Sequence, residues 1–236
     1  MAPLRRRLPG PSHGYLAWLW LRRDLKTRYA DSIGGGLWAL LAPLATIALF
    51  YLVFARILQV RIPRDDGAPE TGFFFFLLAG FLPWLAIGEG LSRAAGSLVA
   101  QEQFLQKMTF PLGLIPATVV VSSAVPQVVG TVVLALLLLS HGEGLAWRWL
   151  WWPLLLGWQL LACLGLGLAL AVVSVHLRDL LQALPVVLQL LFYAAPILYP
   201  KALVPEAYHP LFWLHPFAGF IECYHALFLG WELSLA

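Results

Sequence analysis

The sequence carries very little charge for its length. Asp, Glu, Lys and Arg make up 11% of its 236 residues, whereas hydrophobic residues make up 61%. The charged residues are absent from four long runs, at residues 37–55, 111–139, 150–175 and 180–199. Each run is of the length that crosses a hydrocarbon core, ~20 residues, and backbone polar groups in lipid are satisfied only within a helix or a closed barrel. We therefore expect an all-α, polytopic membrane protein with one transmembrane domain over residues 1–236, whose function lies in transport.

Several kinds of chemical site are also missing. There are two cysteines, Cys163 and Cys223, both in apolar surroundings, so a disulfide framework is not expected. No G-x-x-x-x-G-K-[ST] run occurs, and Gly34-Gly35-Gly36 lacks the lysine of a phosphate-binding loop. The histidines have no metal-binding spacing and no accompanying carboxylate cluster. We expect no cofactor or metal in this chain, and any ATP used in transport would be bound by another subunit.

Basic residues gather before the first apolar run, at Arg5–Arg7, Arg22, Arg23, Lys26 and Arg28. By the positive-inside rule this predicts a cytoplasmic N-terminus. Basic residues beside a span are typical of topology signals or of contacts with anionic lipids, so no nucleic acid partner is expected. The apolar piece 15–21 is too short for a cleavable signal peptide.

The predicted topology begins with an amphipathic helix that lies in the membrane interface. In residues 15–31, Trp18, Leu21, Leu25 and Tyr29 recur at helical spacing, with Arg23 and Lys26 to one side. Five spans are then expected, at residues 37–57, 72–95, 111–139, 150–175 and 180–199.

Residues 200–230 differ from the spans. Four prolines divide the segment, yet seven aromatic residues fill it. It is too broken for a plain span and too apolar for a solvated loop. A re-entrant or interfacial helical hairpin on the outer side, with its backbone sheltered by protein, fits best.

A polar stretch at residues 97–110 has the character of a docking element. It presents hydrogen-bonding groups beside apolar anchors, which an ordinary loop does not need. With Arg23 and Lys26 of the 15–31 helix, it would form a cytoplasmic face for a soluble partner. The candidate contact residues in the stretch are Glu102, Gln103, Phe104, Leu105, Gln106 and Lys107.

Two further groups of residues are candidates for a transport path. Glu89 and Arg93 lie on one helical face of the second span, so they form either a mutually neutralising pair or a gate contact. Aromatic residues within the spans either pack helices together or line a path suited to the apolar faces of sugars and to lipid tails. These path candidates are Trp38, Tyr51, Trp84, Phe192, Tyr193 and Tyr199.

Five stretches, in order, resemble the membrane subunits of ATP-binding-cassette (ABC) exporters of O-antigen, capsule and teichoic acid. They are Arg23-Asp24-Leu25-Lys26-Thr27-Arg28-Tyr29 followed by Leu37-Trp38-Ala39-Leu40-Leu41-Ala42-Pro43-Leu44; Leu78-Ala79-Gly80-Phe81-Leu82-Pro83-Trp84; Phe104-Leu105-Gln106-Lys107-Met108-Thr109-Phe110-Pro111 with Ile115-Pro116; Arg178-Asp179-Leu180; and Pro196-Ile197-Leu198-Tyr199-Pro200. Any one of these motifs is weak, but five in register are specific.

The resemblance implies a homodimer of six-helix subunits in the bacterial inner membrane, joined to two separate ABC ATPase subunits that bind ATP and Mg. Residues 15–31 would be the interface helix, 97–110 would hold the coupling helix, and 200–230 would be the outer hairpin. A lipid-linked glycan would move outward along the dimer axis. The sequence departs from the family pattern at His215 and His225, where Asn and Arg are expected. Leu112-Gly113 replaces a charged pair, and five spans are recognisable in residues 1–236 where the family has six.

These observations lead to one main hypothesis and two alternatives. The main hypothesis is the permease subunit of an ATP-driven exporter of lipid-linked polysaccharide, in contact with membrane lipids. The first alternative is a related permease that exports a small hydrophobic molecule or drug. The second is a membrane-embedded glycosyltransferase or acyltransferase, which would need clustered acidic or histidine residues at one membrane face.

Overall fold

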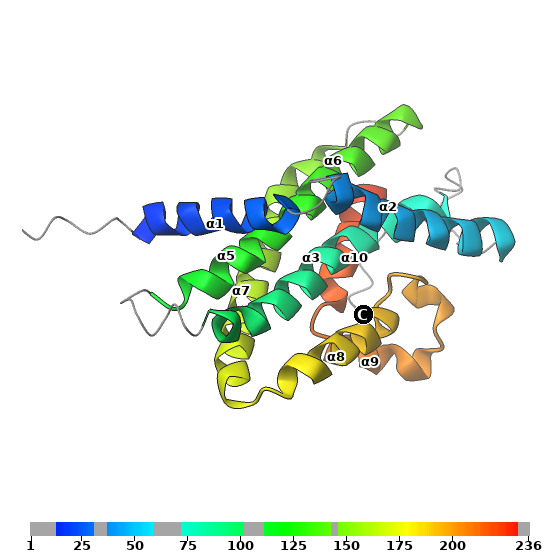
Figure 1. Cartoon of the computed structure of the whole chain (residues 1–236). Coiled ribbons are helices and arrows are strands. Elements are labelled where there is room, and N and C mark those ends of the chain that lie inside the picture. Colours follow the sequence, from blue (N-terminus) through cyan, green and yellow to red (C-terminus); the bar gives the residue numbers. More distant parts are fainter. Residues whose placement is uncertain (1–12, 31–36, 59–71, 102–110, 143–145, 231–236) are drawn as a thin grey trace, which may run out of the picture.

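The computed structural model describes residues 13–30, 37–58, 72–101, 111–142 and 146–230, and every regular element in these ranges is a helix (Figure 1). The elements in chain order are α1 (His13–Ala30), α2 (Leu37–Phe50), the π-helix η1 (Tyr51–Ile57), α3 (Phe73–Ala100), α5 (Leu114–Ser123), α6 (Val125–Ser140), the 3₁₀ turn η2 (Trp147–Trp151), α7 (Trp152–His176), α8 (Leu180–Ala194), the 3₁₀ turns η3 (Lys201–Leu203) and η4 (Glu206–Tyr208), α9 (His209–Leu214) and α10 (Ala218–Leu229). The all-α prediction is confirmed.

Three helical segments are long and apolar enough to cross a membrane. They are Phe73–Ala100, Leu114–Ser140 and Trp147–His176, judged by length and composition over the described residues. Shorter apolar helices cover Leu180–Ala194 and Ala218–Leu229. The chain is therefore a multi-pass membrane protein, as its lack of charge predicted.

Helix α3 is the centre of the molecule. It contacts α5, α6, α7, α8 and α10 (Figure 1). Its side chains are buried along nearly the whole length, including Leu77 and Ile87, which have no exposed surface. The helix runs on to Ala100, where the sequence predicted an end at residue 95. The extension follows from burial, because Leu98 continues the apolar face and packs with Ile115 of α5.

The third predicted span is interrupted. It begins at Leu114, not at residue 111, and it breaks into α5 and α6 at Ala124. Pro126 lies in the first turn of α6, where its missing N–H costs no helical hydrogen bond. A proline inside one continuous helix would have removed such a bond, so the chain starts a new helix there.

The first and fifth predicted spans are shorter as α-helices than expected. Residues 37–57 divide into the 14-residue α2 and the 7-residue π-helix η1. Helix α8 ends at Ala194, where an end at residue 199 was predicted. Ala195 is extended, with φ −81° and ψ 150°, because a residue before proline avoids the helical region, and Pro196 follows.

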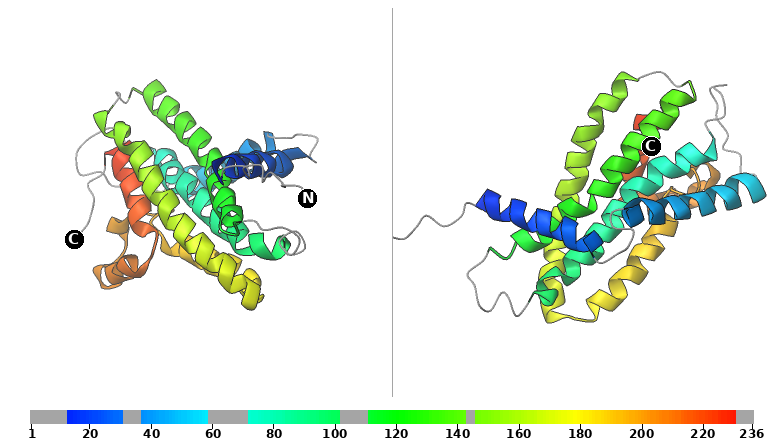
Figure 2. Two further views of the ribbon diagram at one scale, coloured as in Figure 1. Left: turned by 90° about the vertical axis from the view of Figure 1, so that its left-hand side faces the viewer. Right: turned by 45° about the horizontal axis from the view of Figure 1, so that its top comes forward.

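Helix α1 forms as predicted and packs against α5. Its half-buried side chains make a stripe of Leu16, Ala17, Trp20, Leu21, Asp24 and Leu25. The structure differs from the predicted stripe at Trp18, which is 51% exposed. In Figure 2 (left), α1 and α2 lie on one side of α3, and α9 and α10 lie on the other.

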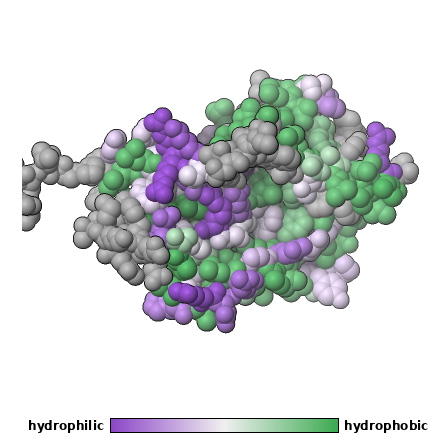
Figure 3. Space-filling model, in the orientation of Figure 1, coloured by the Kyte–Doolittle hydropathy of each residue, from purple (hydrophilic) through white to green (hydrophobic). Residues whose placement is uncertain are grey.

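The surface is mostly hydrophobic. On the face shown in Figure 3, hydrophilic residues gather over α1 and at the turn between α7 and α8, while hydrophobic residues cover much of α6. Exposed apolar side chains recur along α6 and α7, for example Leu136, Leu154 and Leu161 at 61%, 65% and 67%. This pattern suits helices whose outer faces meet lipid tails and not water.

Residues 200–230 form a helical hairpin made of η3, η4, α9 and α10. Before α10 begins, the rings of His215 and Phe217 approach Trp84, near the middle of α3. Near the end of α10, His225 stacks on Phe76, close to the start of α3. The stretch from His215 to His225 therefore runs along the first half of α3, from Trp84 back to Phe76. That this segment is re-entrant and lies on the outer side stays a prediction.

Candidate functional site

A cluster of charged and hydroxyl side chains joins α1 to α3 and α5. The guanidinium of Arg93 donates a hydrogen bond of 2.6 Å to Oδ1 of Asp24 and lies 3.6 Å from Oε1 of Glu89. The same guanidinium is 3.4 Å from the hydroxyls of Ser122 and Ser123. The hydroxyl of Ser122 donates its one proton to Oδ2 of Asp24 at 2.5 Å. The cluster therefore connects three helices through one cation.

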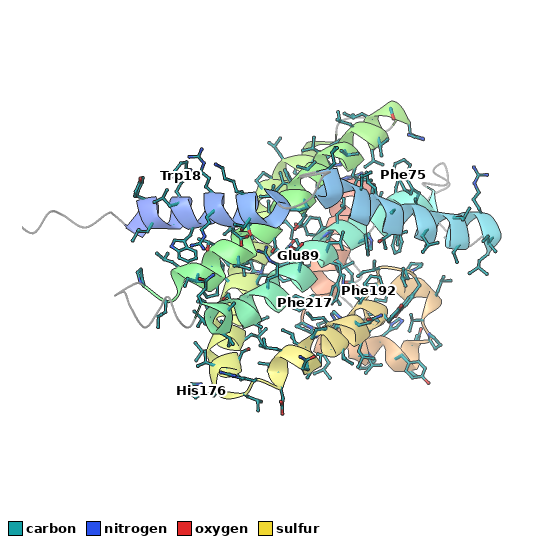
Figure 4. The ribbon with its side chains drawn as sticks, in the orientation of Figure 1. Trp18, Phe75, Glu89, His176, Phe192 and Phe217 are labelled. Atoms are coloured by element: carbon teal, nitrogen blue, oxygen red, sulfur yellow. The ribbon has the colours of Figure 1, made fainter. Side chains whose placement is uncertain are left out.

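The local sequence explains how these groups meet. Glu89 and Arg93 are one turn apart on α3, so they face the same way. Ser122 and Ser123 end α5. The hydroxyl of Ser123 donates to the carbonyl of Val119 at 3.0 Å, and the hydroxyl oxygen of Ser122 lies 2.9 Å from the same carbonyl. Figure 4 shows Glu89 on α3, close to the end of α1.

An apolar contact lies next to this cluster. Trp20 of α1 packs on a small core of Leu98, Ile115 and Ala171. Beside it is a pocket of about 240 Å³, whose lining includes Trp20, Asp24, Arg93, Ser97 and Gln101. Trp20 and Asp24 are one helical turn apart, so a single face of α1 makes both contacts.

The predicted partner-contact residues divide into two groups. Arg23 and Lys26 are exposed on α1, and the guanidinium of Arg23 lies 5.0 Å from the centre of the Trp20 ring. Glu102, Gln103, Phe104, Leu105, Gln106 and Lys107 lie outside the described residues. Their role in docking stays a prediction.

Two of the predicted path aromatics are packed inside the bundle. Trp84 and Phe192 are 7% and 8% exposed, and their ring centres are 5.9 Å apart. Phe217 joins them, with its ring centre 6.2 Å from Trp84. Figure 4 shows Phe192 and Phe217 between α3 and α8. In the single chain, Trp84 and Phe192 therefore pack helices together.

Of the other path candidates, some lie nearer the surface, and some have side chains outside the part of the chain that the structure describes. Tyr193 is 52% exposed, and its backbone carbonyl accepts a 2.7 Å hydrogen bond from the hydroxyl of Tyr199. Trp38 lies in α2 and Tyr51 begins the π-helix η1, but their side chains are outside the described residues. The structure therefore brings Trp84 to Phe192 and Tyr193 to Tyr199.

Both unusual histidines hold the hairpin in place. The Nε2 atom of His215 is 2.9 Å from the carbonyl oxygen of Leu191 on α8, and its Nδ1 accepts from the N–H of Phe217. Since a carbonyl only accepts, Nε2 carries the proton. In the same way, Nε2 of His225 donates to the carbonyl of Phe76 on α3 at 3.0 Å.

A buried polar network that the sequence analysis did not identify fixes α10 to α6 and α7. The amides of Gln127 and Gln159 exchange hydrogen bonds of 2.8 and 3.0 Å. The Tyr224 hydroxyl accepts from Gln127 at 2.8 Å and donates to Gln159 at 2.7 Å. All three side chains are 1% exposed. The sequence did hold a sign of this network, because glutamines occur inside long apolar runs, and polar residues within a membrane need hydrogen-bonding partners.

An arginine completes the attachment of the hairpin. Nε of Arg148 donates to the carbonyl of Leu227 in the last turn of α10 at 2.9 Å. Helix ends leave such carbonyls without helical partners. Gly230 follows with φ 73°, a left-handed conformation that glycine adopts without strain.

The described residues hold no group of three or more His, Cys, Asp or Glu side chains that could bind a metal ion. The site is instead a set of mechanical connections. One links α1 to the bundle, and the others link the hairpin of residues 200–230 to α3, α6, α7 and α8.

Comparison with known proteins gives this arrangement a family. Residues 15–229 match the family model described as "ABC-2 type transporter". The chain is 27% identical to the O-antigen export system permease protein RfbA of Klebsiella pneumoniae over 213 residues, which is 90% of this chain and 79% of that protein. It is 29% identical to the protein of the same name from Myxococcus xanthus, over 88% of this chain and 78% of the relative.

A third relative is named for the transport of a different glycan. The polysialic acid transport protein KpsM of Escherichia coli is 26% identical over 203 residues, which is 85% of this chain and 76% of that protein. Because the family model covers nearly all of the described helices, this multi-pass membrane protein belongs to the ABC-2 type transporter family.

Proposed function

We propose that this chain is the permease subunit of an ATP-driven exporter that moves a lipid-linked polysaccharide, O-antigen or a related glycan, out across the bacterial inner membrane. The observation that carries the proposal is the match to relatives named for O-antigen export and polysialic acid transport over 85% or more of the chain. Relatives with two different glycans support a polysaccharide as the class of substrate.

The energy source would be a separate protein. The sequence has no phosphate-binding loop, and the family name implies an ABC ATPase partner. Two ATPase subunits would bind ATP and Mg and dock on the cytoplasmic side, with residues 97–110 and α1 as the contact surface. The basic residues around α1 support a cytoplasmic N-terminus.

The translocation path would form between two copies of the chain. A glycan is too wide for the interior of one copy, where Trp84 and Phe192 are buried against each other. On α8, exposed Val186, Leu190 and Tyr193 present an apolar face with one aromatic ring. Such a face suits both lipid tails and sugar rings, so α8 is our candidate for the wall of the path.

Inactivation of the gene in its own host tests the proposal. Without this chain, surface polysaccharide should be lost and its lipid-linked precursor should accumulate on the cytoplasmic side of the membrane. Expression of the chain from a plasmid should restore both. Unchanged surface polysaccharide in the deletion strain would contradict the proposed function.

A further inference from the structure

We infer that Asp24 and Arg93 form an ionic latch, a salt bridge that holds α1 against α3 and α5. Through this latch, a movement of α1 that ATP hydrolysis drives would shift α3 and α5 and so be coupled to transport. The inference rests on the proposed function, since it assumes an ATPase partner that moves α1. Asp24 and Arg93 are positioning residues in this account, because they act through the helices that they join.

The first step of the argument is how α1 is attached. Among the elements, α1 makes its main contact with α5. Its one face carries an apolar anchor, Trp20 on Leu98, Ile115 and Ala171, and an ionic anchor, Asp24 on Arg93. The opposite face is exposed, with Trp18 and Arg22 stacked at 5.2 Å. A force on the exposed face would therefore reach the bundle through these anchors.

The second step is the balance of charge in the cluster. Arg93 lies between two carboxylates, Asp24 on another helix and Glu89 on its own helix. If α1 moves away, Arg93 keeps Glu89 as a counter-charge, so the separation does not leave an unpaired cation in the membrane domain. The three charges thus allow two arrangements: in one, Arg93 holds Asp24 and α1 is joined to α3; in the other, Arg93 pairs with Glu89 alone and α1 is released. Coupling between two sites requires an element with two states of this kind.

The third step is the room for such a change. The Asp24 and Arg93 side chains are 18% and 30% exposed, so neither is locked in a dry core. The pocket of about 240 Å³ borders both of them. There is therefore space beside both partners of the pair, on the side of Ser97 and Gln101. Glu89 already lies 3.6 Å from the guanidinium, so Arg93 needs little movement to pair with it when Asp24 withdraws.

The test uses Asp24→Asn in the complete complex of this chain with its ATPase partner, reconstituted in lipid vesicles. Asparagine keeps the size of the side chain and removes its charge. We expect polysaccharide moved per ATP hydrolysed to fall about 5- to 100-fold, the usual range of a coupling interaction. ATPase binding and the thermal midpoint of the complex should be nearly unchanged. Glu206→Gln, which removes an exposed carboxylate of η4, is the matched control and should keep the wild-type ratio.

Two further variants separate coupling from simple stability. Asp24→Glu keeps the charge and should retain most of the transport per ATP. Asp24→Arg places two cations together and should abolish most of the transport per ATP. The double variant Asp24→Arg with Arg93→Asp restores a pair of opposite charges and should recover part of the transport per ATP. Recovery of the ratio by the exchange would show that the pair acts as a latch.

Some results would overturn the inference. The first is an Asp24→Asn variant that moves as much polysaccharide per ATP hydrolysed as the wild type. The second is a variant in which this quantity falls only in proportion to a loss of thermal stability or of ATPase binding. A wild-type chain that binds no ATPase and moves no polysaccharide would instead overturn the proposed function.

Discussion

At the scale of single residues, the most informative feature is where polar side chains are buried. Gln127, Gln159 and Tyr224 satisfy one another in a place where each alone would be costly. Such networks fix one arrangement of helices, because a shifted helix would leave donors and acceptors unpaired. This network therefore determines the position of α10 against α6 and α7.

The network gives a ranked prediction of stability. Tyr224→Phe removes a hydroxyl that makes two hydrogen bonds, while Gln127 and Gln159 keep each other. Gln159→Leu leaves both Gln127 and Tyr224 without that partner, and each unsatisfied buried group costs about 1–3 kcal/mol. We expect Gln159→Leu to lower the thermal midpoint in detergent more than Tyr224→Phe does. Tyr208→Phe, at a residue 57% exposed, is the control and should change little. The reverse order would contradict the network.

In the cluster around Arg93, residue spacing in the sequence predicted one contact of the arginine and missed another. The Glu89–Arg93 pair was predictable because residues four apart on a helix are neighbours. The contact of Arg93 with Asp24 was not, since the two lie 69 positions apart in sequence, and only the packing of α1 on α5 brings them together. The role of Asp24 therefore required the structure.

At the scale of elements, the decisive contact is that between α3 and α10 (Figure 1). The absence of a side chain at Gly80 makes room for it. A Cβ atom there would lie 2.9 Å from Nε2 of His225 and 3.2 Å from Cγ2 of Ile221. Small residues permit this close approach between membrane helices, and here it lets His225 reach the carbonyl of Phe76.

Gly80→Ala should therefore separate the hairpin from α3. The added methyl group collides with the imidazole that donates to Phe76, so we expect a lower thermal midpoint and weaker protection of α10 in hydrogen exchange. Gly88→Ala is the matched control, because its Cβ would meet only Nε1 of Trp84 at 3.8 Å. Alanine is also the better helix former, so the control should be as stable as the wild type or slightly more so. Equal behaviour of the two variants would contradict this account of the contact.

The sequence predicted which segments are helical better than it predicted where they end. An uncharged apolar run of hydrocarbon length gave α7, and the prolines and aromatic residues of 200–230 gave the hairpin. The breaks at Ala124 and Ala195 depend instead on Pro126 and Pro196. The hydropathy of a run does not predict these breaks. Proline removes a backbone hydrogen-bond donor and restricts the residue before it, but it does not make the run polar.

At the scale of the whole molecule, the connections divide into two sets. One set, Asp24 with Arg93 and Trp20 with its apolar core, joins α1 to α3, α5 and α7. The other set, made by His215, Tyr224, His225 and Arg148, fixes the hairpin of residues 200–230 to the bundle. Arg93 of the first set and Phe76, which accepts from His225 of the second set, both lie on α3, so this helix links α1 to the hairpin.

The most direct test of the central claim is ATP-dependent movement of polysaccharide in inverted membrane vesicles. These vesicles would contain this chain, its ATPase partner and the lipid-linked glycan of the host. We predict that ATP drives the glycan into the vesicle lumen, and that omission of this chain or inactivation of the ATPase abolishes the movement. Movement of the glycan at the same rate without this chain, or without ATP hydrolysis, would contradict the account.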